Sequence, residues 1–227
     1  MKKSIKRIPV IGHLVQSLYG KWFAPRKSFA GSEAYWTARY ESAGSSGPGS
    51  YNKLAEFKAE VLNNFVQQKN IRTVIEYGCG DGNQLKLAVY PSYVGFEISP
   101  RAIALCENTF AGDQTKKFKL MKDYQGESAQ LTLSLDVIFH LVEDQVFEEH
   151  MRRLFDSSES YVIIYSSDTE EEPAKSLPQV RRRKFTTWVA EHEPAWRLLQ
   201  HIPNRYPFRG DSTTGSRSDF YIYEKSG

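Results

Sequence analysis

The fold is decided by residues 74–82, which read Val-Ile-Glu-Tyr-Gly-Cys-Gly-Asp-Gly. The β-branched residues favour a buried strand, and the three alternating glycines let the chain turn sharply and bring its backbone close to a ligand. Leu85, Leu87, Ala88 and Val89 follow, and their spacing favours a helix that starts just past the turn. A strand, a glycine turn and a helix together predict one half of a nucleotide-binding α/β unit.

The spacing and charge of this turn favour one kind of ligand. Its glycines follow the pattern G-x-G-x-G, and Asn83 stands where the dinucleotide-binding pattern G-x-G-x-x-G requires glycine. Glu76 lies two residues before the first glycine, where its carboxylate would repel a pyrophosphate and attract a cation. The turn therefore disfavours NAD and favours a cationic ligand.

The pattern E-x-G-x-G-x-G at a strand end resembles motif I of the class I S-adenosylmethionine-dependent methyltransferases. In that family the acid helps to hold the amino group at the methionine end of the cofactor, and the glycines accommodate the rest of it. The resemblance assigns cofactor contacts to Glu76, Gly78, Cys79, Gly80 and Gly82. Apart from the resemblance, Cys79 is best interpreted as a small side chain buried in the turn.

A second acid follows the next expected strand, residues 93–98. Glu97 lies 21 residues after Glu76, about one strand–helix–strand step, where an acid can bind two ribose hydroxyls. A strand-end carboxylate in isolation is more often simply solvated. Because Glu76 and the glycines accompany it, we interpret Glu97 as ribose-binding, with Ile98 beside it in contact with the cofactor.

Composition limits the classes of protein. A chain of 227 residues with 40% hydrophobic content can bury one sizeable α/β core. The net charge of +3 is too small to argue for nucleic acid as a partner. Two cysteines offer neither a disulfide framework nor a metal cluster, so we expect no metal and a reducing, cytoplasmic location. No apolar stretch approaches the roughly 20 residues of a membrane span.

The N-terminal residues differ from the rest of the chain. We expect a basic extension over residues 1–30, a helical lid or cap over 31–70, and the methyltransferase core over 71–227. Pro9 and Gly12 interrupt the apolar part of the extension, which argues against a secretory signal. Basic residues flank the apolar ones in residues 1–27, so this segment is either an arm packed on its own domain or a weak contact with the inner membrane surface.

Large aromatic residues and an arginine precede a Gly/Ser-rich loop at residues 43–50. A loop of this composition is either a flexible linker or part of a lid. In many class I methyltransferases an N-terminal segment with such residues folds over the cofactor. The resemblance therefore makes lid contacts of Tyr35, Trp36, Arg39, Ser50 and Tyr51.

Strand and helix patterns alternate along the chain. Helical patterns cover residues 54–65, 100–106, 144–155 and 185–192, and strand patterns cover 118–121, 131–138, 161–167, 196–202 and 219–223. This order predicts an α/β fold with a doubly wound, mostly parallel sheet. The resemblance, over residues 35–224, implies the seven-stranded Rossmann-like methyltransferase fold with an antiparallel edge strand and an N-terminal helical extension.

Ligands of such sheets bind beyond the carboxyl ends of the strands. Asp123 and Tyr124 follow the third strand, where the family places a polar residue near the adenine. Asp136 and His140 follow the fourth, so Asp136 is a candidate for both cofactor contact and catalysis. Methyl transfer depends mainly on positioning, and an imidazole titrates near neutral pH, so His140 is the best candidate base. Otherwise His140 only caps the strand or contacts the adenosine. Asp136 either orients His140 or the acceptor, or forms a structural hydrogen bond to a neighbouring loop.

Two further segments are candidates for binding the methyl acceptor. Residues 181–184, Arg-Arg-Arg-Lys, would suit an acidic or phosphate-bearing acceptor, but they also suit a solvated face paired with the acidic residues at 168–172. Residues 202–208 form a rigid aromatic turn in which Arg205 and Tyr206 either wall an acceptor pocket or pack on the end of the sheet.

The layout is similar to that of small bacterial methyltransferases of glycan and secondary-metabolite pathways. The expected function is methyl transfer from S-adenosylmethionine to an oxygen or nitrogen of a small molecule or glycan, leaving S-adenosylhomocysteine. The alternative is a non-catalytic or RNA- or protein-directed S-adenosylmethionine-binding module. An NAD-dependent oxidoreductase is less favoured, because Glu76 and Asn83 do not fit NAD.

Overall fold

The computed structural model describes residues 29–171 and 177–226. Most of the expected basic extension, and with it the predicted membrane-surface contact of residues 1–27, lies outside the described residues. No helix in the described part of the chain is long and apolar enough to span a membrane.

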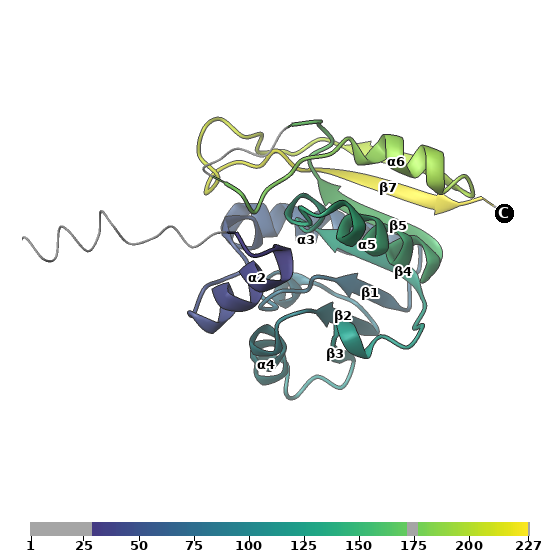
Figure 1. The fold of residues 1–227 in the computed structure, drawn as a ribbon. Coiled ribbons are helices and arrows are strands. Elements are labelled where there is room, and N and C mark those ends of the chain that lie inside the picture. Colours follow the sequence, from purple (N-terminus) through teal and green to yellow (C-terminus); the bar gives the residue numbers. More distant parts are fainter. Residues whose placement is uncertain (1–28, 172–176, 227) are drawn as a thin grey trace, which may run out of the picture.

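The strands form one seven-stranded sheet in the order β3-β2-β1-β4-β5-β7-β6 (Figure 1). Neighbouring strands from β3 through β5 are parallel, and β7 is antiparallel to both β5 and β6. The predicted fold class is therefore confirmed, with the reversed strand one place in from the edge strand β6. The strands are β1 (Val74–Tyr77), β2 (Tyr93–Glu97), β3 (Lys116–Leu120), β4 (Ala129–Leu135), β5 (Ser158–Ser166), β6 (Trp196–Ile202) and β7 (Asp219–Lys225).

Helices cover both faces of the sheet, as a doubly wound fold requires. One core cluster joins side chains of α3 to β1, β4, β5 and β7, and a second joins α5 and α6 to the opposite face. In Figure 1, α2 lies at the end of the sheet toward which the parallel strands run. The helices are α2 (Ser32–Glu41), α3 (Asn52–Gln68), α4 (Pro100–Thr109), α5 (Asp144–Asp156) and α6 (Phe185–His192).

Helix α3 is part of the core. Its predicted stripe places Leu54, Phe57, Leu62 and Phe65 at 1–7% exposure. Full burial of each such side chain contributes about 1.5–3 kcal/mol, so the sheet holds α3 strongly. The hydrophobic core therefore includes side chains from both sides of residue 71, where the sequence analysis placed the boundary between cap and core. Of the α-helices in the expected cap, only α2 lies outside the layers that cover the sheet.

The helix expected after the glycine turn does not form. Only a single 3₁₀ turn, Gln84–Leu87, separates the glycines from β2, and Leu87 and Val89 are 41% and 73% exposed. The chain must reach β2 at Tyr93, and Asn63 of α3 bonds the main chain of both Leu87 and Val89 at 2.9 Å, which holds the segment extended. A short crossover and competing hydrogen bonds thus override the helical spacing.

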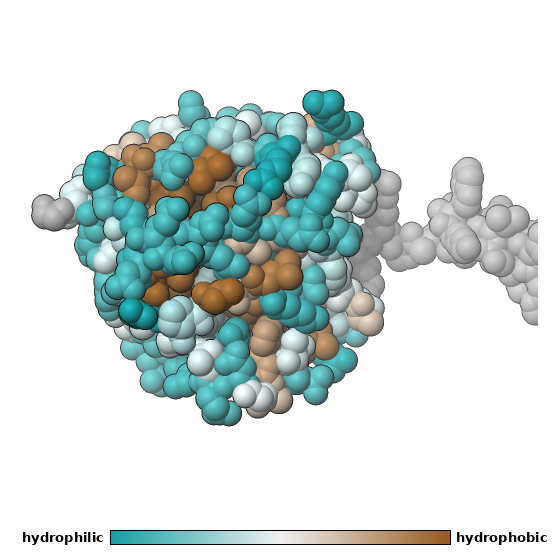
Figure 2. Space-filling model, turned by 180° about the vertical axis from the view of Figure 1, so that it is seen from behind, coloured by the Kyte–Doolittle hydropathy of each residue, from teal (hydrophilic) through white to brown (hydrophobic). Residues whose placement is uncertain are grey.

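The surface mixes charged and apolar side chains. Figure 2 shows this on the face opposite to that of Figure 1, where hydrophilic residues surround smaller apolar areas. Such interspersion is usual for a globular domain, since apolar atoms supply about half of any protein surface.

Candidate active site

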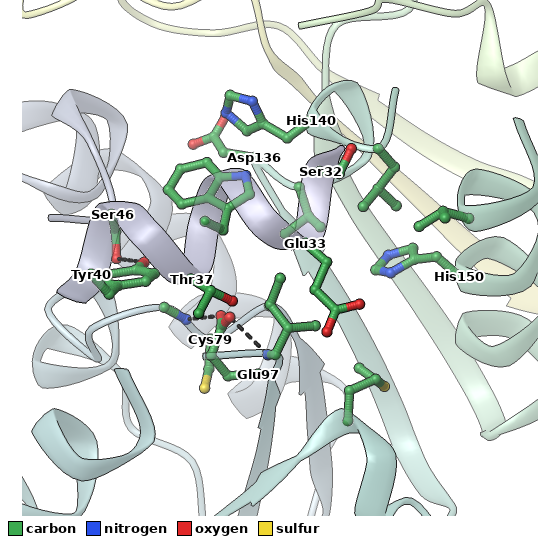
Figure 3. A pocket seen from close by; sticks show the side chains of 18 of the residues that line it. Ser32, Glu33, Thr37, Tyr40, Ser46, Cys79, Glu97, Asp136, His140 and His150 are labelled. Atoms are coloured by element: carbon green, nitrogen blue, oxygen red, sulfur yellow. Dashed lines mark hydrogen bonds between the residues drawn. The ribbon is translucent and has the colours of Figure 1, made fainter. Parts of the chain in front are cut away.

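A cleft of about 1070 Å³ opens at the carboxyl ends of β1, β2 and β4, with α2 along its mouth (Figure 3). This is where the sequence placed the ligand. The sequence-predicted residues that line it are Trp36, Ser50, Glu76, Gly78, Cys79, Gly80, Glu97, Ile98, Asp136 and His140.

Glu97 is held at the end of β2 by backbone donors. Its carboxylate accepts from the amides of Gly80 at 3.0 Å, Ile98 at 2.8 Å and Ser99 at 3.2 Å (Figure 3 draws bonds at this carboxylate). Glu97 is only 6% exposed, and burial raises its pKa against the lowering effect of these donors. The carboxylate is fixed in place, and its remaining lone pairs can face a ligand in the cleft.

Glu76 is the second buried carboxylate of the cleft. Burial raises its pKa to about 7, while the hydroxyl of Tyr93, which donates to it at 2.7 Å, and the nearby charge of Lys58 act in the lowering direction. Since its pKa lies near neutrality, Glu76 responds to any charge that enters the cleft.

The 43–50 loop is hydrogen-bonded to the glycine turn. Asp81 accepts from the amide of Ser46 at 2.9 Å and the hydroxyl of Tyr51 at 2.8 Å, and its own amide donates to Ser46 Oγ at 2.9 Å. Asn83, which sets the turn apart from the dinucleotide pattern, donates to the carbonyl of Ser50 at 2.7 Å. These bonds dock the loop against the turn, which disfavours the flexible-linker interpretation.

Helix α2 is attached at both ends. At its start, the amide and hydroxyl of Ser32 donate to Glu143 at 2.9 and 2.6 Å, and Ser32 Oγ accepts from the amide of Val142. At its end, the hydroxyl of Tyr40 lies 3.0 Å from Ser46 Oγ in the docked loop. The helix thus bridges the β4–α5 loop and the glycine turn across the cleft.

Asp136 ends β4 in a strained conformation, with φ of 59°. One carboxylate oxygen accepts from Lys58 Nζ at 2.9 Å and the other from Ser218 Oγ at 2.8 Å. The Lys58 side chain is 1% exposed and that of Asp136 is 19% exposed, so the cation of this ion pair is buried and the carboxylate is partly exposed. Asp136 therefore bonds neighbouring elements, which is the structural role given as its alternative. Among the described residues no hydrogen bond joins it to His140.

His140 lies beside Trp36, their rings 4.8 Å apart and edge to face. Its Nδ1 is 2.9 Å from the carbonyl of Gln179, which can only accept, so Nδ1 carries the proton and Nε2 is left as the acceptor. Burial lowers the pKa of His140 to about 4, against the raising effect of that bond and of Asp136. The ring is therefore neutral at physiological pH.

Several predicted site residues lie outside the cleft lining. Tyr35 and Arg39 contact each other, and Arg39 donates to the carbonyl of Ser45, so they shape the loop. Gly82 lies against α4, where an added Cβ would meet Cys106 Sγ at 3.0 Å. Tyr51 bonds Asp81.

The two residues expected near the adenine are placed differently from the sequence-based prediction. Asp123 is exposed, and Tyr124 packs against Phe96 with ring centroids 5.5 Å apart. The short 3₁₀ turn Met121–Asp123 rotates successive side chains, so Met121 and Lys122 line the cleft in their place.

The segments considered for the acceptor are internally paired. Arg181 and Arg183 both bond Asp144 at 2.9 Å, and Arg182 bonds Glu171 at 2.9 Å. In the 202–208 turn, Arg205 forms a two-pronged ion pair with Glu60, and neither Arg205 nor Tyr206 lines the cleft. Among the described residues, only Arg182 pairs with the acidic run expected as the partner of residues 181–184, because Arg181 and Arg183 bond Asp144 instead. Tyr206 packs against the hydrophobic core, as in the packing interpretation of the 202–208 turn.

The sequence analysis missed Lys58 and Gln84, which line the cleft, and Asp81, which holds the 43–50 loop against the glycine turn. Lys58 had a readable signal: it lies four residues after Leu54 and four before Leu62, in the buried register of α3. A lysine in a core register is almost always paired or functional. Asp81 and Gln84 stood within and just after the glycine turn without a pattern of their own.

Comparison with solved structures identifies the class of fold. No protein-family model matches the chain, and no curated protein sequence matches it. The structural neighbours, the sheet order and the cleft together give the chain the fold of the class I S-adenosylmethionine-dependent methyltransferases.

Three solved structures illustrate the likeness. N-methyltransferase NodS from Bradyrhizobium japonicum WM9 has a TM-score of 0.61 at 11% identity, over 84% of this chain and 98% of that one. Magnesium protoporphyrin IX methyltransferase from Synechocystis PCC 6803 has 0.59 at 13%, over 86% and 100%. The methyltransferase domain of bacterial CtHen1-C has 0.58 at 15%, over 75% and 97%.

Proposed function

We propose that the protein is an S-adenosylmethionine-dependent methyltransferase. The observation that carries this proposal is the pair of buried carboxylates, Glu76 and Glu97, on either side of the glycine turn at the floor of one cleft. Two of the neighbours by fold were solved with bound cofactor or product, the Synechocystis enzyme and NodS.

The residues present fit the cofactor. Glu97 would bind the ribose hydroxyls, Glu76 the ammonium group, and Ile98 and Met121 would flank the adenine. The glycine turn can approach the ligand closely because Gly78 and Gly80 carry no side chain and take φ of 85° and 60°. The buried amide oxygen of Gln84 has no hydrogen-bond partner among residues 29–171 and 177–226 and lies in the same cleft, as expected where a ligand supplies the donor.

When bound, S-adenosylmethionine would supply an electrophilic methyl group. Nε2 of His140 would take the proton that the oxygen or nitrogen of the acceptor must lose, and the carbonyl of Gln179 fixes the ring for that task. The low pKa of His140 keeps Nε2 unprotonated, at the cost of making it a weak base. Asp136 and Lys58 orient the end of β4 that carries His140.

Helix α2 serves as a lid in this proposal. Trp36 closes the cleft beside His140, and the attachments through Ser32 and Ser46 hold the helix in place. A closed cleft excludes water from the methyl transfer and orients the acceptor.

The acceptor proposed is a small molecule or glycan that presents an oxygen or nitrogen. Acidic residues outnumber basic ones along the cleft, and the three arginines of the basic run at 181–184 are paired elsewhere, which disfavours phosphorylated acceptors and nucleic acid. Glu33 of α2 points into the cleft in Figure 3. The acids are Glu33, Glu41, Glu76, Glu97, Asp136, Glu143 and Glu149, and the bases are Lys58, Lys122 and Arg153.

Calorimetric titration with S-adenosylmethionine, S-adenosylhomocysteine and NAD at pH 8 and pH 6 tests the proposal. We expect the first two to bind and NAD not to bind. We also expect affinity to be about ten-fold lower at pH 6, because Glu76 must be ionised to hold an ammonium group and its pKa is about 7 in the free protein. Binding should release protons near neutral pH. Binding of NAD alone would contradict the proposal.

His140→Ala tests the catalytic role. Turnover should fall about 100-fold or more, while the affinity for S-adenosylhomocysteine stays within about three-fold, because the ring acts on the acceptor. His192→Ala is the matched control, since His192 is an exposed histidine on α6, stacked on Trp188 away from the cleft. Weakened cofactor binding with near-normal turnover would show that His140 only supports the cofactor. If both the wild type and His140→Ala bind S-adenosylhomocysteine but neither methylates any acceptor, the binding-module alternative would be favoured.

A further inference from the structure

Gln84 presents a buried hydrogen-bond acceptor, its Oε1 atom, in the cleft. Its Nε2 donates to the carbonyl of Ala55 at 3.0 Å. That bond fixes the amide, because a carbonyl can face only the NH₂ group, so Oε1 must point the other way. Gln84 is 8% exposed, and Oε1 has no hydrogen-bond partner among the described residues.

A buried cation lies on the same wall. Lys58 follows Ala55 by three residues on α3, so the two lie on one helical face. Its ammonium group has three donors, of which one bonds Asp136, and Tyr165 presents its ring 5.2 Å from Nζ. Lys58 also lines the cleft and acts electrostatically on Glu76.

Lys58, Gln84 and Glu76 thus place one cation and two acceptors together in the cleft, at the end of β1. A ligand complementary to this set carries a carboxylate and an ammonium group on one carbon, as an α-amino acid does. We propose that Lys58 and Gln84 recognise this zwitterion at the methionine end of the cofactor, Lys58 binding the carboxylate and Gln84 Oε1 accepting from the ammonium group beside Glu76. The assignment rests on the proposed function, and it names two residues that bind the methionine end of S-adenosylmethionine.

Three ligands that share an adenosine part test the assignment on the full chain by calorimetry. They are S-adenosylmethionine, its decarboxylated form, and 5′-methylthioadenosine, which lacks the amino-acid end. Lys58→Met should weaken S-adenosylmethionine about ten-fold or more and leave the other two within about three-fold. Gln84→Leu should weaken both ligands that carry the ammonium group about ten-fold and leave 5′-methylthioadenosine unchanged.

Matched variants separate recognition from folding. Lys69→Met and Gln67→Met change exposed residues at the end of the same helix and should bind all three ligands normally. Because Lys58→Met leaves Asp136 unpaired, the double variant Lys58→Met/Asp136→Asn keeps the readout if the single variant is unstable. Binding of 5′-methylthioadenosine reports a folded cleft in each case.

The outcomes are distinct. Parallel weakening of all three ligands would overturn the assignment in favour of a structural role, and so would unchanged binding in Gln84→Leu, where water would then occupy the site. A wild-type chain that binds none of the three would contradict the proposed function itself.

Discussion

Glu97→Gln is expected to lower the affinity for S-adenosylmethionine about 100-fold and to destabilise the fold by about 2 kcal/mol. The carboxylate accepts from the amides of Gly80, Ile98 and Ser99. Glutamine has one oxygen, so its NH₂ group would face an N–H donor, and one buried amide would lose its partner. The same exchange removes an acceptor for the ribose hydroxyls.

A ribose-specific readout separates binding from stability. Wild-type protein should prefer 5′-methylthioadenosine to its 2′-deoxy analogue about ten-fold or more, and Glu97→Gln should lose that preference. Asp123→Asn is the matched control, because this acid lies in the short turn after the neighbouring strand β3 but is exposed to solvent. Retained preference in Glu97→Gln would refute ribose binding, and an effect of Asp123→Asn would restore the adenine role first expected for that residue.

The fold could be predicted from the sequence because the hydrophobic patterns that define its helices and strands are periodic and local. The stripe of α3 and the buried run of β5 each arise from many side chains that agree, so single exceptions do not change the result. The segment after the glycine turn failed for the opposite reason. Its helical spacing was overridden by two hydrogen bonds to Asn63, which donates to Leu87 and accepts from Val89. Asn63 lies on another element, and no local pattern connects it to these residues.

The site could be predicted only in part from the sequence. Glu76 and Glu97 follow from their places at strand ends, a rule of topology. The role of Asp81 depends on which loop lies over the glycine turn. The role of Gln84 depends on the hydrogen bond from its Nε2 to the carbonyl of Ala55, which leaves Oε1 free to face the cleft. These are tertiary contacts, and no regular spacing of residues in the sequence signals them. Asp123 and Met121 show the same limit, since a turn of three residues decides which of them faces the cleft.

Gly80→Ala is expected to destabilise the protein by about 2–4 kcal/mol and to weaken cofactor binding about ten-fold or more. Gly80 has φ of 60°, a conformation that costs an alanine about 1–2 kcal/mol. A Cβ would also clash with Ser46 Oγ and lie 2.9 Å from the hydroxyl of Tyr40. Ser46 must therefore move, which breaks its bonds to Asp81 and releases the 43–50 loop from the glycine turn.

Gly112→Ala is the matched control, because nothing lies within 4 Å of its added Cβ and its φ carries no such strain. We expect its free energy of unfolding, measured with urea, to stay within about 0.5 kcal/mol of the wild type. Ser46→Ala removes the closest clashing atom, so the double variant Gly80→Ala/Ser46→Ala should lose less stability than the sum of the single variants. Strict additivity, or a Gly80→Ala protein as stable as Gly112→Ala, would mean that the loop tolerates displacement and that its contact with the glycine turn does not support the cleft.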